Sequence, residues 1–366
     1  MKRPSQDTSR SGPILALTSA LLFGASTPLA KLLLGATDPL LLAGILYLGS
    51  GFGLALMTLG GRVFRQSARS EAPLRRHDLP WLALIVLFGG VLGPALLMGG
   101  LTATPAATGS LLLNTESIAT MAIAWIVFRE NVDRRVFTGA MAILAGAIVL
   151  SWPGGANESL GFGWGGALIV GACLCWGIDN NLTRKLSAAD PVQITTIKGI
   201  VAGAVNVTLA LAHGGHLAGA APMAAAAAVG FFGYGVSLVL FVLGLRHLGA
   251  ARTGAYFSTA PFIGAAIALP LFGDPLTWSL VAAAALMAVG VYLHLSEKHE
   301  HEHVHEPHVH EHRHVHDAHH QHGHGPDDPA DEPHTHRHQH ARLVHAHPHY
   351  PDVHHRHSHE RMEEDT

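Results

Sequence analysis

The sequence predicts an all-α integral membrane protein: ten transmembrane helices arranged as two inverted five-helix repeats, with a disordered histidine-rich C-terminal tail. Three observations support this fold class. Apolar segments of membrane-spanning length follow one another through residues 1–296, motifs of the first half recur in the second, and residues 297–366 are polar and rich in histidine. The formal net charge of −3 averages a basic body, with 17 Lys or Arg against 11 Asp or Glu, and an acidic tail, with 6 against 15.

The apolar segments are long enough to cross a bilayer as helices. A helix needs about 20 apolar residues to span a hydrocarbon core of about 30 Å. Lipid leaves no partner for free backbone groups, so each segment is expected to be helical. The ten predicted spans are 13–34, 39–60, 79–101, 106–128, 136–152, 163–182, 192–212, 223–245, 251–272 and 276–295.

The loops between the spans predict their orientation. Lys and Arg occur in alternate connections, at 61–78, 129–135, 184–185 and 246–252. The intervening connections, at 102–105, 153–162, 213–222 and 273–275, contain neither residue. Because positively charged loops stay in the cytoplasm, the N-terminal residues 1–12 and the tail 296–366 are both predicted to be cytoplasmic, in an inner (plasma) membrane.

The two halves repeat the same motifs in the same order. Residues 13–152 and 163–295 form the predicted repeats, joined by an external linker at 153–162. Five spans per repeat is an odd number, so the second repeat must cross the membrane in the opposite sense. The matches are Phe23-Gly24 with Trp176-Gly177, Asp38-Pro39 with Asp190-Pro191, Thr108-Gly109 with Thr253-Gly254, Phe128-x-Glu130 with Phe272-x-Asp274, and Gly146 with Gly290. Inverted repeats are common in secondary transporters, whose substrate site lies near the bilayer midplane between the halves.

With these motifs, and with Leu113-Asn114-Thr115-Glu116 and Pro261 in spans four and nine, the chain resembles the EamA-type family of the drug/metabolite transporter superfamily over roughly residues 13–295. The resemblance implies a carrier that moves small metabolites, amino acids or drugs, mostly outward, by alternating access without ATP. The chain departs from many relatives in span two, where Ile45-Leu46-Tyr47 replaces a zone that often holds arginine. The matching zone of span seven carries Lys198.

Glu116 is the strongest candidate for a substrate or coupling site. It lies about ten residues into its span, or about 15 Å deep at 1.5 Å per residue. Placing a charged residue at mid-span costs about 2.5–3.5 kcal/mol, so such residues usually face a cavity and mark a transport pathway. The alternative is a structural polar contact between helices.

Lys198 is the second candidate. Its ammonium could bind a substrate anion or neutralise Glu116, or it could extend to the nearby interface, which a long side chain can reach. Asn114, Thr115, Ser258 and Thr259 are candidate hydrogen-bonding residues of the site wall, or polar contacts that only hold helices together. The run from Asp179 to Asn181 is expected to be satisfied by water at the inner end of its helix.

No enzyme is predicted. The chain contains no phosphate-binding loop of the G-x-x-x-x-G-K-[ST] type, no H-E-x-x-H zinc motif and no nucleophile elbow. Transport is therefore expected to use an ion gradient or the substrate's own gradient, with no required cofactor. The expected partners are the lipid bilayer, a small-molecule substrate and divalent metal ions, and not nucleic acid; the oligomeric state is left open, with a dimer as one option.

The tail holds 24 of the 29 histidines, and they alternate almost strictly through residues 299–316. Alternate residues of an extended chain share a face, and imidazole suits Zn, Ni or Co. The tail has too few apolar residues to form a core, so it is expected to be disordered without metal. The candidate metal ligands are His299, His301, His303, His305, His308, His310, His312, His314 and His316.

Three functions remain open at this point. The first is the metabolite, amino-acid or drug carrier implied by the family resemblance. The second is a carrier of divalent metal (Zn, Ni or Co) that the tail feeds or gates. The third is a membrane-anchored metal-binding or sensor protein that transports nothing. Within the first reading, the tail is either a metal store or sensor that gates transport, or an inert extension.

Overall fold

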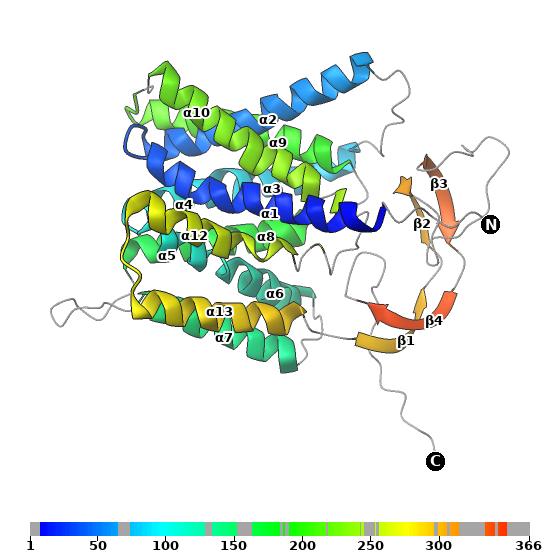
Figure 1. Ribbon diagram of the computed structural model, residues 1–366. Helices are drawn as coiled ribbons and strands as arrows, with labels where there is room; N and C mark the ends of the chain where they lie inside the picture. The colour runs from blue at the N-terminus through cyan, green and yellow to red at the C-terminus, as the bar shows by residue number, and fades with distance from the viewer. Residues whose placement is uncertain are drawn as a thin grey trace.

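The computed structural model places a bundle of helices in the body of the chain and four short strands in the tail (Figure 1). The structure describes residues 8–64, 74–128, 134–151, 163–183, 186, 190–216, 219–241, 243–244, 253, 256–295, 299–305, 308–314, 334–340 and 343–349. The predicted loop residues Glu130, Arg184 and Arg246 lie outside this part.

The helical segments follow the predicted spans closely. In the first half they are α1 (Thr8–Leu33), α2 (Pro39–Phe64), the short 3-10 helix η1 (Arg76–Asp78), α3 (Leu79–Ile85), η2 (Val86–Leu92), α4 (Gly93–Thr102), α5 (Ala106–Leu112), α6 (Thr115–Phe128) and α7 (Arg134–Ser151). In the second half they are α8 (Trp164–Thr183), α9 (Pro191–Ala212), α10 (Ala220–Gly230), η4 (Phe231–Val236), α12 (Ala260–Phe272) and α13 (Trp278–Leu295).

The helices confirm a multi-pass membrane protein. Among the described residues, six helical stretches are long and apolar enough to cross a membrane: Gly12–Leu33, Pro39–Gly60, Arg76–Thr102, Ala106–Val127, Val192–Ala212 and Ala220–Phe241. Three shorter apolar helices, Phe137–Leu150, Ala260–Phe272 and Trp278–Leu293, lie at three of the other predicted spans. The 20-residue helix α8 lies at the remaining one.

The recurring Asp-Pro pairs begin equivalent helices. The Asp38 carboxylate accepts hydrogen bonds from the backbone N–H groups of Leu40 and Leu41, at 3.0 and 3.1 Å. Asp190 likewise accepts from the N–H of Val192, at 2.9 Å, at the start of α9. Aspartate satisfies N–H groups that have no partner within the helix, and proline suits the first helical position because it lacks an N–H.

Equivalent helices of the two halves pack against each other, α2 on α9 and α7 on α13 (Figure 1). The contacts of α7 and α13 mirror one another. A Cβ built on Gly146 of α7 would lie 2.7 Å from Cγ of Met287, and one built on Gly290 of α13 would lie 2.6 Å from Cγ1 of Ile143. Only glycine allows the backbones to approach this closely, which explains the matched glycines of the two halves.

Four spans are interrupted, again in matching pairs. The third and eighth spans each contain a π-helical segment, η2 and η4. The fourth span breaks at residues 113–114 and the ninth turns at 258–259, before α12 begins. The hydropathy of the sequence does not reveal the π form of the third and eighth spans. Interrupted helices and π segments are common at functional sites of membrane proteins because they release backbone carbonyls.

Lys31, in the last turn of α1, is held by backbone carbonyls. Its ammonium donates to the carbonyl oxygens of Leu101 and, at 2.8 Å, of Thr104 at the end of α4. These acceptors have no partner within their own helix, so Lys31 connects the ends of α1 and α4.

Four segments of the tail form strands, while the expectation that the tail is disordered without metal stays a prediction. Strand β1 (His299–His305) pairs antiparallel with β4 (Leu343–His349), and β2 (His308–His314) pairs with β3 (His334–His340). The expectation considered only the missing apolar core. Alternating sequences can pair through backbone hydrogen bonds when a second segment of the same pattern lies opposite.

Candidate functional site

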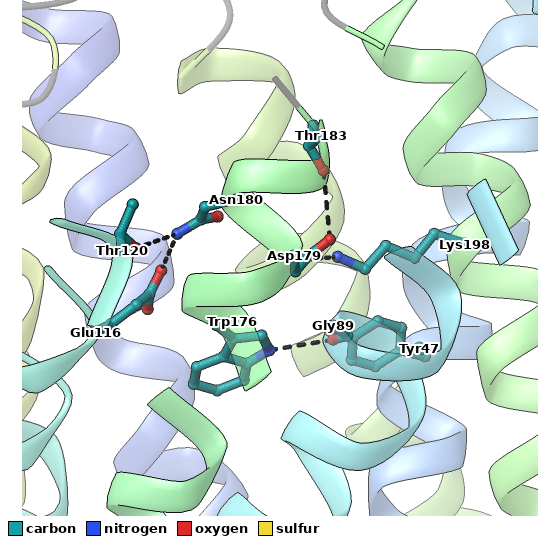
Figure 2. A network of polar contacts seen from close by, with 9 residues as sticks. All are labelled: Tyr47, Gly89, Glu116, Thr120, Trp176, Asp179, Asn180, Thr183 and Lys198. Atoms are coloured by element: carbon teal, nitrogen blue, oxygen red, sulfur yellow. Dashed lines mark hydrogen bonds and ion pairs between the residues drawn. The ribbon is translucent and has the colours of Figure 1, made fainter. Parts of the chain in front are cut away.

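Glu116 lies at the start of α6, directly after the break in the fourth span. This position in the first helical turn favours a carboxylate, since the N-terminal end of a helix carries partial positive charge. Its Oε1 accepts a hydrogen bond of 2.8 Å from Nδ2 of Asn180, which also donates to Thr120 Oγ1 at 3.2 Å (Figure 2). Glu116 is half-buried and Asn180 is exposed, so the amide that binds the carboxylate remains accessible.

An ion pair lies beside this group. The Lys198 ammonium of α9 contacts Oδ2 of Asp179 on α8, and Oδ1 of Asp179 accepts from Thr183 at 3.3 Å (Figure 2). The side chains of Lys198 and Asp179 are only 17% and 8% exposed. The Lys198 side chain is therefore directed at Asp179 and is mostly buried.

The network contains more negative than positive charge. Glu116 interacts electrostatically with both Asp179 and Lys198. Two carboxylates therefore share one ammonium among the residues of Figure 2. When all three are ionised, the site has a net charge of −1. An additional proton or a ligand cation would balance it.

The π segment η2 contributes backbone carbonyl acceptors to the network. Its Gly89 carbonyl accepts from Tyr47 Oη at 2.7 Å and from Trp176 Nε1 at 3.1 Å (Figure 2). The Gly90 carbonyl accepts from Asn206 Nδ2 at 3.0 Å. A π segment frees carbonyls from the regular helical pattern, and here three side chains from α2, α8 and α9 bind them.

Gly89 also lies directly beside the ion pair. A Cβ built at this position would meet the Asp179 carboxylate and would lie 2.6 Å from the Lys198 nitrogen. The absence of a side chain at Gly89 is therefore required for Asp179, Lys198 and η2 to fit together.

The four predicted wall residues have mostly local roles. Asn114 donates to the carbonyl of Leu111 at 3.0 Å, and Thr115 donates to that of Leu112 at 2.7 Å. In the ninth span, Thr259 donates to the carbonyl of Tyr256 at 2.6 Å. These bonds satisfy carbonyls at the helix breaks. Ser258 lies in the same turn as Thr259.

The structure brings into the network several residues that sequence reasoning did not select: Asp179, Asn180, Tyr47 and Trp176. Asp179 was expected to meet water, but it is buried against Gly89 and Lys198. A signal was present, because Asp179 follows Trp176 of the repeated motif by three residues and so shares its helix face. Tyr47 belongs to the zone where the sequence departs from many relatives.

The predicted metal ligands lie in the tail. His299 to His305 fall on β1 and His308 to His314 on β2, whereas His316 lies outside the described residues. Among the residues whose side chains the structure describes, which do not include those of the tail, no group of three or more His, Cys, Asp or Glu is placed to hold a metal ion.

Comparison with known proteins agrees with this architecture. A solved structure with 18% sequence identity superposes with a TM-score of 0.55, covering 78% of this chain and 96% of its own, which shows a shared fold. An "Uncharacterized transporter" of Methanothermobacter thermautotrophicus is 28% identical over 292 residues, 77% of this chain and 85% of that protein. A "Probable amino-acid metabolite efflux pump" of Salmonella typhimurium is 25% identical over 303 residues, 78% of this chain and 95% of that protein. The model of the EamA-like transporter family matches twice, at residues 10–152 and 163–296, and the chain therefore belongs to the EamA-like transporter family.

Proposed function

We propose that the protein is a secondary carrier that exports a small metabolite, of the amino-acid type, across the inner membrane by alternating access. Family members are transporters rather than enzymes. The amino-acid class and the outward direction are supported by the printed name of the Salmonella typhimurium relative. The proposed topology has ten spans and two cytoplasmic ends, as the loop charges predict.

One observation carries the proposal: a polar network joins the two family-matched segments within the bundle. Tyr47, Gly89 and Glu116 come from the first segment, and Asp179 and Lys198 from the second (Figure 2). In inverted-repeat carriers, a site between the halves is exposed to each side in turn as one half moves against the other. Contacts between the halves, such as those of this network, would change when one half moves against the other.

The charges of the network suit a substrate with both signs. The ammonium of an amino-acid-type substrate would bind Glu116, and its carboxylate would bind Lys198 in place of Asp179. The released Asp179 would retain the hydrogen bond from Thr183. Charged groups inside a membrane protein typically mark such pathways. A proton and the substrate ammonium would compete for the Glu116 carboxylate, and this exchange would couple transport to a proton gradient.

The test is efflux from proteoliposomes loaded with labelled amino acids, with and without an imposed pH gradient. Glu116→Gln keeps the size and hydrogen bonding of the side chain but removes its charge, so we expect coupled efflux to fall at least tenfold with the protein still folded. Glu158→Gln, the same chemical change in the linker predicted to be external, is the matched control. Wild-type efflux by the Glu116 variant would refute the proposal.

The metal-carrier and metal-sensor alternatives are tested by removing residues 297–366. The proposed metabolite carrier should retain its efflux after truncation. A metal carrier fed by the tail should lose much of its Zn, Ni or Co flux, and a pure metal-binding protein should lose its activity completely. Measuring both amino-acid and metal fluxes on the same vesicles distinguishes the three functions.

A further inference from the structure

The histidines of the tail face one another in register. In the β1–β4 ladder, three histidines of β1 lie opposite histidines of β4: His299 with His349, His301 with His347, and His303 with His345. In the β2–β3 ladder, all four pair: His308 with His340, His310 with His338, His312 with His336, and His314 with His334. Seven histidine pairs therefore lie across the two ladders.

Both ladders belong to one fold-back of the tail. His308 lies nine positions after His299 in the first arm of the fold-back. Their partners, His340 and His349, are also nine positions apart in the second arm. The ladders therefore share a single register, in which β2 and β3 are nested between β1 and β4.

The sequence itself contains a matching feature. Histidines occupy odd positions in β1 and even positions in β2, because His308 follows His305 by three positions, whereas neighbouring histidines within each strand are two positions apart. On the return, the five-residue step from His340 to His345 changes even back to odd. Since side chains alternate between faces, an odd step on one strand must be matched on the other for the histidines to remain paired. Both odd steps, from His305 to His308 and from His340 to His345, fall between one ladder and the other.

The register places the histidines of each ladder on one face. The positions between them pair separately on the other face, for example Val304 with Val344 and Glu311 with Arg337. Directly opposite residues have Cβ atoms about 4.5–5.5 Å apart, and neighbouring rungs of one face are about 7 Å apart along a strand. Two neighbouring rungs therefore bring four histidine positions into an area of about 5 by 7 Å.

We propose that these two ladders form metal sites, in which four histidines from two neighbouring rungs bind one divalent ion of the Zn, Ni or Co class. Four imidazoles can surround Zn at about 2.0–2.1 Å in a tetrahedral arrangement. Four rungs in the β2–β3 ladder would hold two ions and three rungs in the β1–β4 ladder one, for about three ions per chain. The ligand set includes the distal histidines 334–349, which the alternating stretch 299–316 alone did not indicate. Bound metal would hold the fold-back closed.

Zinc titration of the full-length protein in detergent tests the ligand set without reference to transport. Changing His334→Ala and His336→Ala removes two neighbouring rungs at one end of the β2–β3 ladder, which together form one proposed site, and we expect the loss of about one tightly bound equivalent in three. The matched control, His320→Ala with His322→Ala, removes two histidines of the connecting segment and should keep wild-type stoichiometry. Equal losses in both variants, or no loss in the first, would overturn the proposal, because binding would then follow histidine number rather than register.

A distance measurement tests the fold-back itself. Spin labels at Val304→Cys and Val344→Cys, in a background with Cys173 and Cys175 replaced by serine, occupy opposite positions on the face without histidine. Saturating zinc should enrich the short distance, and EDTA should reduce that population. A label pair at Val304→Cys and Gln339→Cys is the off-register control. A long 304–344 distance in saturating zinc would overturn the proposal even if transport proved to be of another kind.

Discussion

Separating the Asp179–Lys198 ion pair should be far more costly than removing it. Lys198→Met leaves the Asp179 carboxylate without its cation, and Asp179→Leu leaves an ammonium in a position that is only 17% exposed. Breaking a buried pair by removing one partner typically costs about 3–5 kcal/mol, whereas replacing both partners by apolar residues is often neutral. Each single variant should therefore lose about 3–5 kcal/mol of unfolding free energy.

The double variant should be more stable than either single variant. It loses only the Asp179 contact from Thr183, worth about 1 kcal/mol, and retains no isolated charge at these positions. The coupling energy in the double-mutant cycle, which is the sum of the two single losses minus the loss of the double variant, should be about 5–9 kcal/mol. The assay is reversible unfolding in mixed micelles with increasing denaturing detergent, followed by tryptophan fluorescence. Additive losses in the double variant would refute the argument that the two charges stabilise each other. Efflux should be lost in the two variants that lack Lys198 if Lys198 binds the substrate.

Three further predictions follow from the same network and from the tail. Gly89→Ala should lower the melting temperature and abolish efflux, because the added Cβ would meet Asp179 and Lys198. The control is Gly60→Ala, where the added Cβ meets nothing within 4 Å, and it should leave the melting temperature and efflux unchanged. Tyr47→Phe should lower the unfolding free energy by about 1 kcal/mol, since it removes one hydrogen bond to a carbonyl that keeps a second donor; a loss above about 3 kcal/mol would show another role. A protein truncated before residue 297 should keep its melting temperature within about 2 °C, because the described helices pack against one another without the tail. Thermal unfolding in detergent measures this, and a large decrease would contradict the prediction.

The membrane class and the position of the helices could be predicted from sequence because both depend on local properties. Hydropathy over about 20 residues is sufficient to locate a span. The Asp-Pro pairs at 38–39 and 190–191 indicate helix starts through capping, which involves only neighbouring residues. Gly146 and Gly290 were recognised only as matching positions of the two halves, and the structure shows that each contacts the other's helix.

The π segments and the break at 113–114 were not predicted, because hydropathy does not distinguish α from π geometry. The segment η2 is as apolar as its flanks, and its π form depends on donors from three other helices that bind the carbonyls of Gly89 and Gly90. In the fourth span, Asn114 and Thr115 were selected as wall residues by residue type. Their bonds to local carbonyls became apparent only when the break at 113–114 was located.

The sequence by itself determined that this is a membrane protein of two matched halves, with an acidic residue in a span and a histidine tail of alternating pattern. Tertiary structure alone decided that Lys198 pairs with Asp179, that Asn180 binds Glu116, and that distal histidines lie opposite proximal ones. The physical reason is that hydropathy and capping act along the chain, whereas the pairing of charges depends on which helix faces meet and exclude water.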